Sequence, residues 1–331
     1  MRGLAAIAVL ACHYTSECSF VGRLDESWVF RLGSYGPHLF FIISGFVILL
    51  SLHRCRGAVE FAFLRFARLF PTYWFGVVLS TVVLISVANE SVAPPTIKQF
   101  VGNLTMLQTW LRIPNIEESY WTLGVELKFY GLAFLLIACG KLKQVELLSC
   151  LWLLVVASFH YLDLLFGLPN ALGTPLIVDF AHLFAAGVMF YRIREAGHSL
   201  LRNTVILLAV PMQAVAEGIE SAIVVAFFLA VFYAFISGGL RWLITRPLQF
   251  LGNISYPLYI VHGSIGIASI HILADGGAPL WALIAVPTFI TFGAATLLHE
   301  FWEKPSGSVL RSWWKQRHAF GRFRTATSDT L

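Results

Sequence analysis

Residues 34–52 read SYGPHLFFIISGFVILLSL. After its opening turn residues, this stretch is almost wholly apolar and is long enough to cross the hydrocarbon core of a bilayer as one helix. Further apolar runs of similar length occur at 72–88, 219–237 and 278–298. The pattern predicts an all-α, polytopic bundle of transmembrane helices.

The composition of the whole chain agrees with this fold class. Of its 331 residues, 58% are hydrophobic and 12% are charged, whereas about 25% of the residues of a soluble domain are charged. The net charge of +5 does not indicate nucleic-acid binding, because the basic residues lie between the apolar segments. The five cysteines form no CxxC pair and have no zinc-site spacing, so we expect no metal.

About ten spans are expected, and the segments between them alternate in charge. One set of connections carries 18 Lys and Arg residues and the other carries 4, and basic residues mark the cytoplasmic side of a membrane protein. Both termini are therefore expected in the cytoplasm of a multi-pass protein. The expected spans are 3–16, 34–52, 72–88, 119–139, 145–167, 175–191, 203–216, 219–237, 248–273 and 278–299.

No separate soluble domain is expected. Residues 1–305 are predicted to form one transmembrane domain, and 306–331 a basic cytoplasmic tail that rests on anionic lipid. The outer segment 89–118 is interpreted as interfacial or partly re-entrant, and 61–70 as an interfacial helix at the cytoplasmic surface. The first residues also fit a short signal peptide, although the repeated spans favour a first span there.

Ionisable residues inside spans indicate function, because burying them in lipid is costly. Arg2 and His13 are eleven positions apart, which places them on one helix face and about 16 Å apart along the axis. In the alternative interpretation, Arg2 reaches to the lipid head groups and His13 is a hydrogen-bonded core residue.

Two arginines and a carboxylate extend this pattern. Arg65 and Arg68 lie one helical turn apart at the cytoplasmic surface, where they are either ordinary positive-inside charge or a clamp for phosphate. Glu126 is predicted about 10 Å below the outer surface, where it needs a partner or a proton. These groups predict a cavity that crosses the bilayer and binds an anion at its cytoplasmic end.

A cluster of polar residues occurs near the end of the chain, within 251–262. Its members are near-helically spaced, but they spread over a wide arc, so only part of the set is expected to face one cavity. They are Ser255, Tyr256, Tyr259 and His262.

Six motifs, in order along the chain, resemble those of acyltransferase family 3, the integral-membrane acyltransferases of bacterial envelopes and some antibiotic and nodulation pathways. They cover the chain from residue 2 to residue 305. The family usually has several residues before its opening arginine, whereas only Met1 precedes Arg2 here. The motifs are RGLAAIAVLACHY (2–14), FFIISGF (40–46), RFARLFPTYW (65–74), YWTLGVELKFY (120–130), LGNISYPLYIVH (251–262) and FWEKP (301–305).

The resemblance implies an O-acyltransferase in the bacterial inner membrane. It would move an acyl group, usually acetyl, from cytosolic acyl-CoA to a hydroxyl of a saccharide or glycolipid acceptor. It also implies that Arg2 and His13 are needed for activity, and that Arg65 and Arg68 lie near the CoA.

The mechanism expected from these residues has His13 as the general base on the acceptor hydroxyl, since histidine titrates near neutral pH. An acyl-histidine intermediate is the less favoured variant. Glu126 would orient the acceptor or pair with His13. Candidates for binding the acceptor or the oxyanion are Ser44, Trp121, Tyr256 and His262.

A transporter, such as a flippase for a lipid-linked saccharide, is the alternative class. It would share the spans and the cavity, but the chain shows no obvious inverted repeat.

Overall fold

The computed structural model describes residues 1–87, 94–169 and 173–326, with side chains to 318. Within these residues every regular element is a helix and no strand occurs. The elements are α1 (Arg2–Phe20), η1 (Glu26–Trp28), η2 (Arg31–Tyr35), α2 (Gly36–Leu52), α3 (Ala58–Ser86), α4 (Ile97–Leu104), η3 (Glu118–Tyr120), α5 (Trp121–Ala138), η4 (Leu142–Gln144), α6 (Val145–Phe166), η5 (Thr174–Leu176), α8 (Ala181–Ala196), α9 (Leu200–Glu217), α10 (Ile219–Ile236), η6 (Arg241–Leu243), α11 (Arg246–Asp275), α12 (Leu280–Leu298), η7 (His299–Glu303, a π-helix) and α13 (Lys304–Ala326).

Nine helical segments of the described chain are long and apolar enough to span a membrane. They match nine of the ten expected spans. The first expected span, 3–16, lies in α1, which is not among the nine because polar residues follow its short apolar stretch. Helix α9 is continuous through Pro211.

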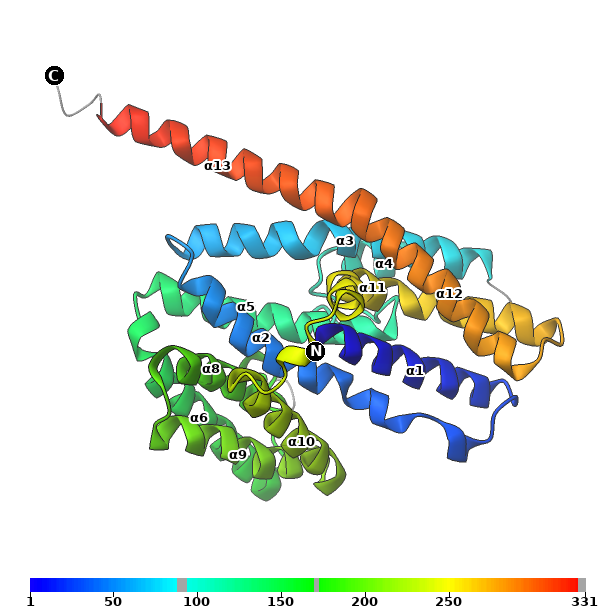
Figure 1. The fold of residues 1–331 in the computed structure, drawn as a ribbon, viewed down its shortest axis with the longest axis horizontal. Coiled ribbons are helices and arrows are strands. Elements are labelled where there is room, and N and C mark those ends of the chain that lie inside the picture. The colour runs from blue at the N-terminus through cyan, green and yellow to red at the C-terminus, as the bar shows by residue number, and fades with distance from the viewer. Residues whose placement is uncertain (88–93, 170–172, 327–331) are drawn as a thin grey trace.

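The bundle has α1 inside it rather than at its edge. Helix α1 packs along α11 on one side and against α2 and η2 on another, and Figure 1 shows the N-terminus in the middle of the assembly. Close packing against α11 is possible because Gly266 faces Tyr14, whose hydroxyl would lie 2.0 Å from a Cβ at that position. The N-terminal helix thus places its polar residues in the interior.

Helices α2 and α8 form a second close contact, at a pair of glycines. A Cβ on Gly45 would lie 2.2 Å from the carbonyl oxygen of Phe184, and a Cβ on Gly187 would lie 2.1 Å from that of Ile42. Small residues of this kind allow helix backbones to approach in membranes, where no hydrophobic effect drives helices together. The contact holds Ser44, next to Gly45, at the centre of the bundle.

The segment between α3 and α5 folds back into the protein. Asn103, Gln108 and Glu117 are all buried within the protein. Residues 88–93, at the start of the segment, lie outside the described residues. A carboxylate oxygen of Glu117 accepts hydrogen bonds from the backbone N–H of Ser264 (2.5 Å) and from the Ser80 hydroxyl (3.0 Å). The folded-back segment is thereby fixed to α11 and α3.

Two expected surface segments continue neighbouring helices. Residues 61–70 are the first part of α3 and run without a break into the span after them. The basic tail begins as α13, which continues α12 through the π-turn η7 and extends beyond the bundle in Figure 1. Phe63 on α3 stacks on Trp314 on α13, with ring centroids 4.4 Å apart. This contact packs the first half of α13 against α3.

Candidate active site

Arginines from two helices gather around one carboxylate. Arg2 on α1 lies within electrostatic range of Arg65 and Arg68 on α3 and of Glu126 on α5. We call these four residues the arginine cluster. Its members come from three of the sequence motifs, so the fold joins motifs that are far apart along the chain.

Within the arginine cluster, Glu126 is held by neutral donors. Ser44 on α2 and Tyr130 on α5 each donate a hydrogen bond of 2.6 Å to its Oε1 atom. No described residue forms a hydrogen bond or an ion pair with Oε2 of Glu126. One carboxylate oxygen is therefore anchored and the other is free.

The three arginines are not neutralised. Arg65 donates a hydrogen bond of 3.1 Å to the Ser51 hydroxyl and lies over the ring of Tyr130, while its Nε is buried with no partner. In the part of the chain that the structure describes, none of Arg2, Arg65 and Arg68 forms a salt bridge at hydrogen-bond distance. Three positive charges against one negative charge, partly screened from water, favour an anionic ligand.

Glu126 acts on Arg2 rather than on His13. It lies in the arginine cluster, whereas the carboxylates that act on His13 are those of Glu118 and Glu17. Tyr259 on α11 donates a hydrogen bond of 3.0 Å to the carbonyl of Ser119, just before α5 begins. This contact fixes the start of α5 against α11.

A histidine pair lies further along α1. The Nδ1 atom of His13 is 3.1 Å from Nε2 of His262 on α11. His13 is partly exposed, while His262 is 1% exposed. Tyr14 fixes the two helices at this level, because its hydroxyl lies 3.2 Å from the His262 carbonyl and 2.7 Å from the Thr291 hydroxyl of α12.

Glu17 adds a second contact between the same two helices, one turn beyond His13. It lies 2.5 Å from Nε2 of His271 on α11. The face of α1 that carries Arg2 and His13 thus also carries Glu17.

The remaining predicted residues have different surroundings. Trp121 packs its ring against Phe180, with centroids 5.5 Å apart. The Tyr256 hydroxyl donates a hydrogen bond of 2.8 Å to the carbonyl of Leu69, beside Arg68. Tyr256 therefore supports the backbone of α3 next to the arginine cluster, and its proton is already engaged.

Local sequence patterns did not indicate a buried polar network between α2, α8 and α9. The Nε2 atom of His38 lies 2.7 Å from Glu217, which accepts a hydrogen bond of 2.9 Å from Gln213, and Gln213 lies 2.7 Å from His182. The helical spacing of Gln213 and Glu217 is a weak local signal, but their partners come from distant helices. None of its four residues belongs to the six motifs.

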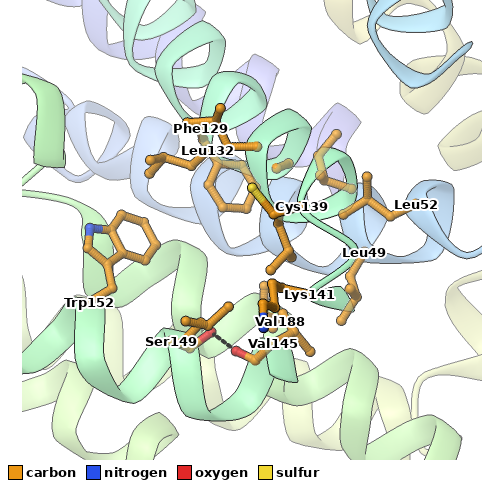
Figure 2. Close-up of a pocket in the computed structure, with 15 residues that line it drawn as sticks. Leu49, Leu52, Phe129, Leu132, Cys139, Lys141, Val145, Ser149, Trp152 and Val188 are labelled. Atoms are coloured by element: carbon orange, nitrogen blue, oxygen red, sulfur yellow. Dashed lines mark hydrogen bonds between the residues drawn. The ribbon is translucent and has the colours of Figure 1, made fainter. Parts of the chain in front are cut away.

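Two hollows flank the polar interior. A cavity of about 420 Å³ between α2, α5, α6 and α8 is lined almost wholly by apolar side chains such as Phe129 and Trp152, with Lys141 as its charged residue (Figure 2). A cleft of about 850 Å³ beside η2 and α10 is more polar and includes Ser16 and Tyr35. Among the described residues, no three His, Cys, Asp or Glu side chains are arranged to hold a metal ion.

The fold and this interior define a class: a multi-pass helical membrane protein with three unneutralised arginines and a histidine pair inside the bundle. Residues 1–300 match the Acyltransferase domain family, Acyl_transf_3. Because this match covers most of the chain, the protein belongs to that family.

A curated relative carries a similar name. The chain is 28% identical over 138 residues to Acyltransferase MdmB from Streptomyces mycarofaciens. The match covers 39% of this chain and 36% of the relative, so it spans about a third of that protein. No solved structure matches the chain significantly.

Proposed function

We propose that the protein transfers an acyl group, usually acetyl, from cytosolic acyl-CoA to a hydroxyl of a saccharide or glycolipid acceptor. The observation that carries this proposal is the arginine cluster, in which three arginines without a salt bridge gather at Arg2, on the helix that also carries the partly exposed His13. Family membership supports acyl transfer as the class of reaction.

The arginine cluster suits the phosphates of CoA. Guanidinium groups bind phosphate oxygens through paired, charge-assisted hydrogen bonds, and these are stronger where water is partly excluded. The CoA phosphates would bind at Arg2, Arg65 and Arg68, with the pantetheine arm directed along α1 toward His13. The spacing of about 16 Å between Arg2 and His13 suits a long, thin chain that ends in a thioester.

His13 would act as the general base. Its ring removes the proton of the acceptor hydroxyl while the oxygen attacks the thioester carbonyl, so a C–O bond forms and the C–S bond breaks. The CoA thiolate then takes the proton from His13, which returns to its neutral form. Atoms and charge balance without a metal or a redox step.

The proposed orientation in the membrane follows from the distribution of Lys and Arg among the connections. The connections rich in Lys and Arg favour the cytoplasmic side, which is where acyl-CoA is made. We propose the bacterial inner membrane as the location, with the acceptor at or beyond the outer face. Comparing surface glycans and lipids by mass spectrometry, with and without this gene, would identify the acceptor.

The binding half of the proposal is tested with Arg65→Ala and Arg68→Ala. Each should weaken acetyl-CoA binding by about 10-fold or more, since a hydrogen bond to a charged group contributes about 1.5–3 kcal/mol. Equilibrium binding of labelled acetyl-CoA to the purified protein measures this loss.

The matched control is Arg54→Ala, which removes an exposed arginine of the nearby α2–α3 connection. Its side chain forms no hydrogen bond or salt bridge with the described residues. It should leave the affinity unchanged. Equal affinity of the wild type and the Arg65 and Arg68 variants would remove these arginines from the site.

A further inference from the structure

The hydrogen bonds of His262 determine which of its nitrogens carries a proton. Its Nδ1 atom lies 2.8 Å from the carbonyl oxygen of Tyr259, one turn earlier on α11. A carbonyl oxygen only accepts hydrogen bonds, so Nδ1 of His262 must be the donor. In the neutral ring, Nε2 then has a lone pair and no proton.

The neutral ring is the form that its surroundings favour. His262 is 1% exposed, and no acidic side chain of the described chain hydrogen-bonds to it. A positive charge there would be buried without a partner, which is energetically costly. Glu117, whose carboxylate lies beside Gly263 on α11, is instead bound to Ser264 and Ser80.

The tautomer of His262 in turn fixes that of His13. Nε2 of His262 lies 3.1 Å from Nδ1 of His13, and an acceptor at one end of a hydrogen bond requires a donor at the other. Nδ1 of His13 must therefore carry its proton, which leaves Nε2 of His13 as the basic atom. No hydrogen bond from the described residues reaches that Nε2.

We propose that His262 is a positioning residue, which holds His13 in the tautomer that leaves its Nε2 free to accept the proton of the acceptor hydroxyl. A carboxylate has this role in the serine-protease triad, where the wrong tautomer costs about 10⁴-fold in rate. Here a neutral, buried imidazole takes the role, and the carbonyl of Tyr259 orients it in turn. The tautomers of the two rings do not depend on the proposed function, whereas their effect on catalysis rests on it.

The backbone around His262 is built to hold this geometry. A Cβ on Gly263 would lie 1.9 Å from a carboxylate oxygen of Glu117. The absence of a side chain at Gly263 therefore lets the folded-back segment clamp α11 directly beside the histidine. The Tyr14 hydroxyl holds the carbonyl of His262 from the other side.

Two amide substitutions separate positioning from packing. In His262→Asn the amide overlays Nδ1, so it keeps the bond to the Tyr259 carbonyl and loses His13. In His262→Gln the amide oxygen overlays Nε2 and still accepts from His13. If His262 had only a packing role, the two variants would not differ in kcat in this order.

The kinetic test uses acetyl-CoA hydrolysis by the purified protein, with water in place of the acceptor and thiol release as the signal. His262→Asn should lower kcat by about 100-fold and His262→Gln by less than about 10-fold, because general-base catalysis contributes about 10²–10⁴-fold. KM for acetyl-CoA should stay within about twofold, since the arginine cluster is untouched. Equal kcat for the two variants would overturn the proposal.

A spectroscopic test needs neither turnover nor a variant at position 262. In ¹⁵N-histidine-labelled wild type, with His13→Gln used to assign the resonance, His13 should be protonated at Nδ1 and bare at Nε2. A proton on Nε2 would contradict the proposal whatever the enzyme does. If the tautomer is as expected but His13→Ala still turns over at the wild-type rate, the proposed base fails instead.

Discussion

At the scale of single residues, the carboxylate of Glu126 accepts its hydrogen bonds from two hydroxyl groups and none from an arginine. Ser44 and Tyr130 both donate to one oxygen of Glu126, although this residue shares its cluster with three arginines. Glu126 therefore reduces the repulsion among the guanidinium groups without neutralising any single one. This arrangement leaves the arginines free for a ligand.

Substitutions of Glu126 test this interpretation. In Glu126→Gln the amide oxygen still accepts from Ser44 and Tyr130 but the repulsion among the arginines rises, so stability should fall less than in Glu126→Leu, and acetyl-CoA affinity should rise because one negative charge leaves the site. In Glu126→Leu the two hydroxyls lose their acceptor, which should cost about 1–3 kcal/mol each where they are buried. Thermal unfolding in detergent and acetyl-CoA binding measure the two effects. A Gln variant that binds acetyl-CoA more weakly would show that Glu126 contacts the ligand directly.

Several residue positions followed from local patterns, but their partners did not. Helical periodicity placed Arg2 and His13 on one face of α1, and a spacing of three placed Arg65 and Arg68 on one face of α3. The hydrogen bond from His13 to His262 depends on how α1 packs against α11, some 250 residues later. Periodicity describes one helix and gives no information on its partner.

At the scale of elements, the glycine contact between α2 and α8 supports the active-site geometry. It brings Ser44 within reach of Glu126 on α5. Substituting Gly187 by Val would drive a side chain into the backbone of α2.

Gly187→Val should therefore destabilise the protein by about 1–3 kcal/mol, the usual cost of overpacking. The control is Gly293→Ala on α12, where no atom lies within 4 Å of the added Cβ. Thermal unfolding should separate the two variants clearly. Equal melting temperatures would mean that α2 and α8 do not approach as closely as described.

The helices themselves were largely predictable, whereas the segment 94–117 was only partly so. Long apolar runs predicted ten spans, and nine of them match apolar helices of the described chain. The detailed fold of 94–117 was not predicted, because it depends on Glu117 reaching Ser264 and Ser80. A single buried carboxylate leaves no periodic signal in the sequence. The network of His38, Glu217 and Gln213 was missed for the same reason.

At the scale of the whole molecule, the proposed function puts the donor site and the base on one helix. Arg2 and His13 both lie on α1, which is enclosed by α2, α11 and α12. The nine apolar spans therefore serve as a scaffold that keeps this polar helix inside a membrane protein. The proposed reaction then has its donor at one end of α1 and its acceptor toward the other.

The most direct test of this account follows a labelled acetyl group across the membrane. Inside-out vesicles that contain the protein expose the basic connections to [¹⁴C]acetyl-CoA, and right-side-out vesicles hide them. The account predicts acylated saccharide or glycolipid only in inside-out vesicles with the wild type, and a loss of about 100-fold or more with His13→Gln. Equal labelling by the folded His13→Gln protein, or labelling of right-side-out vesicles alone, would contradict it.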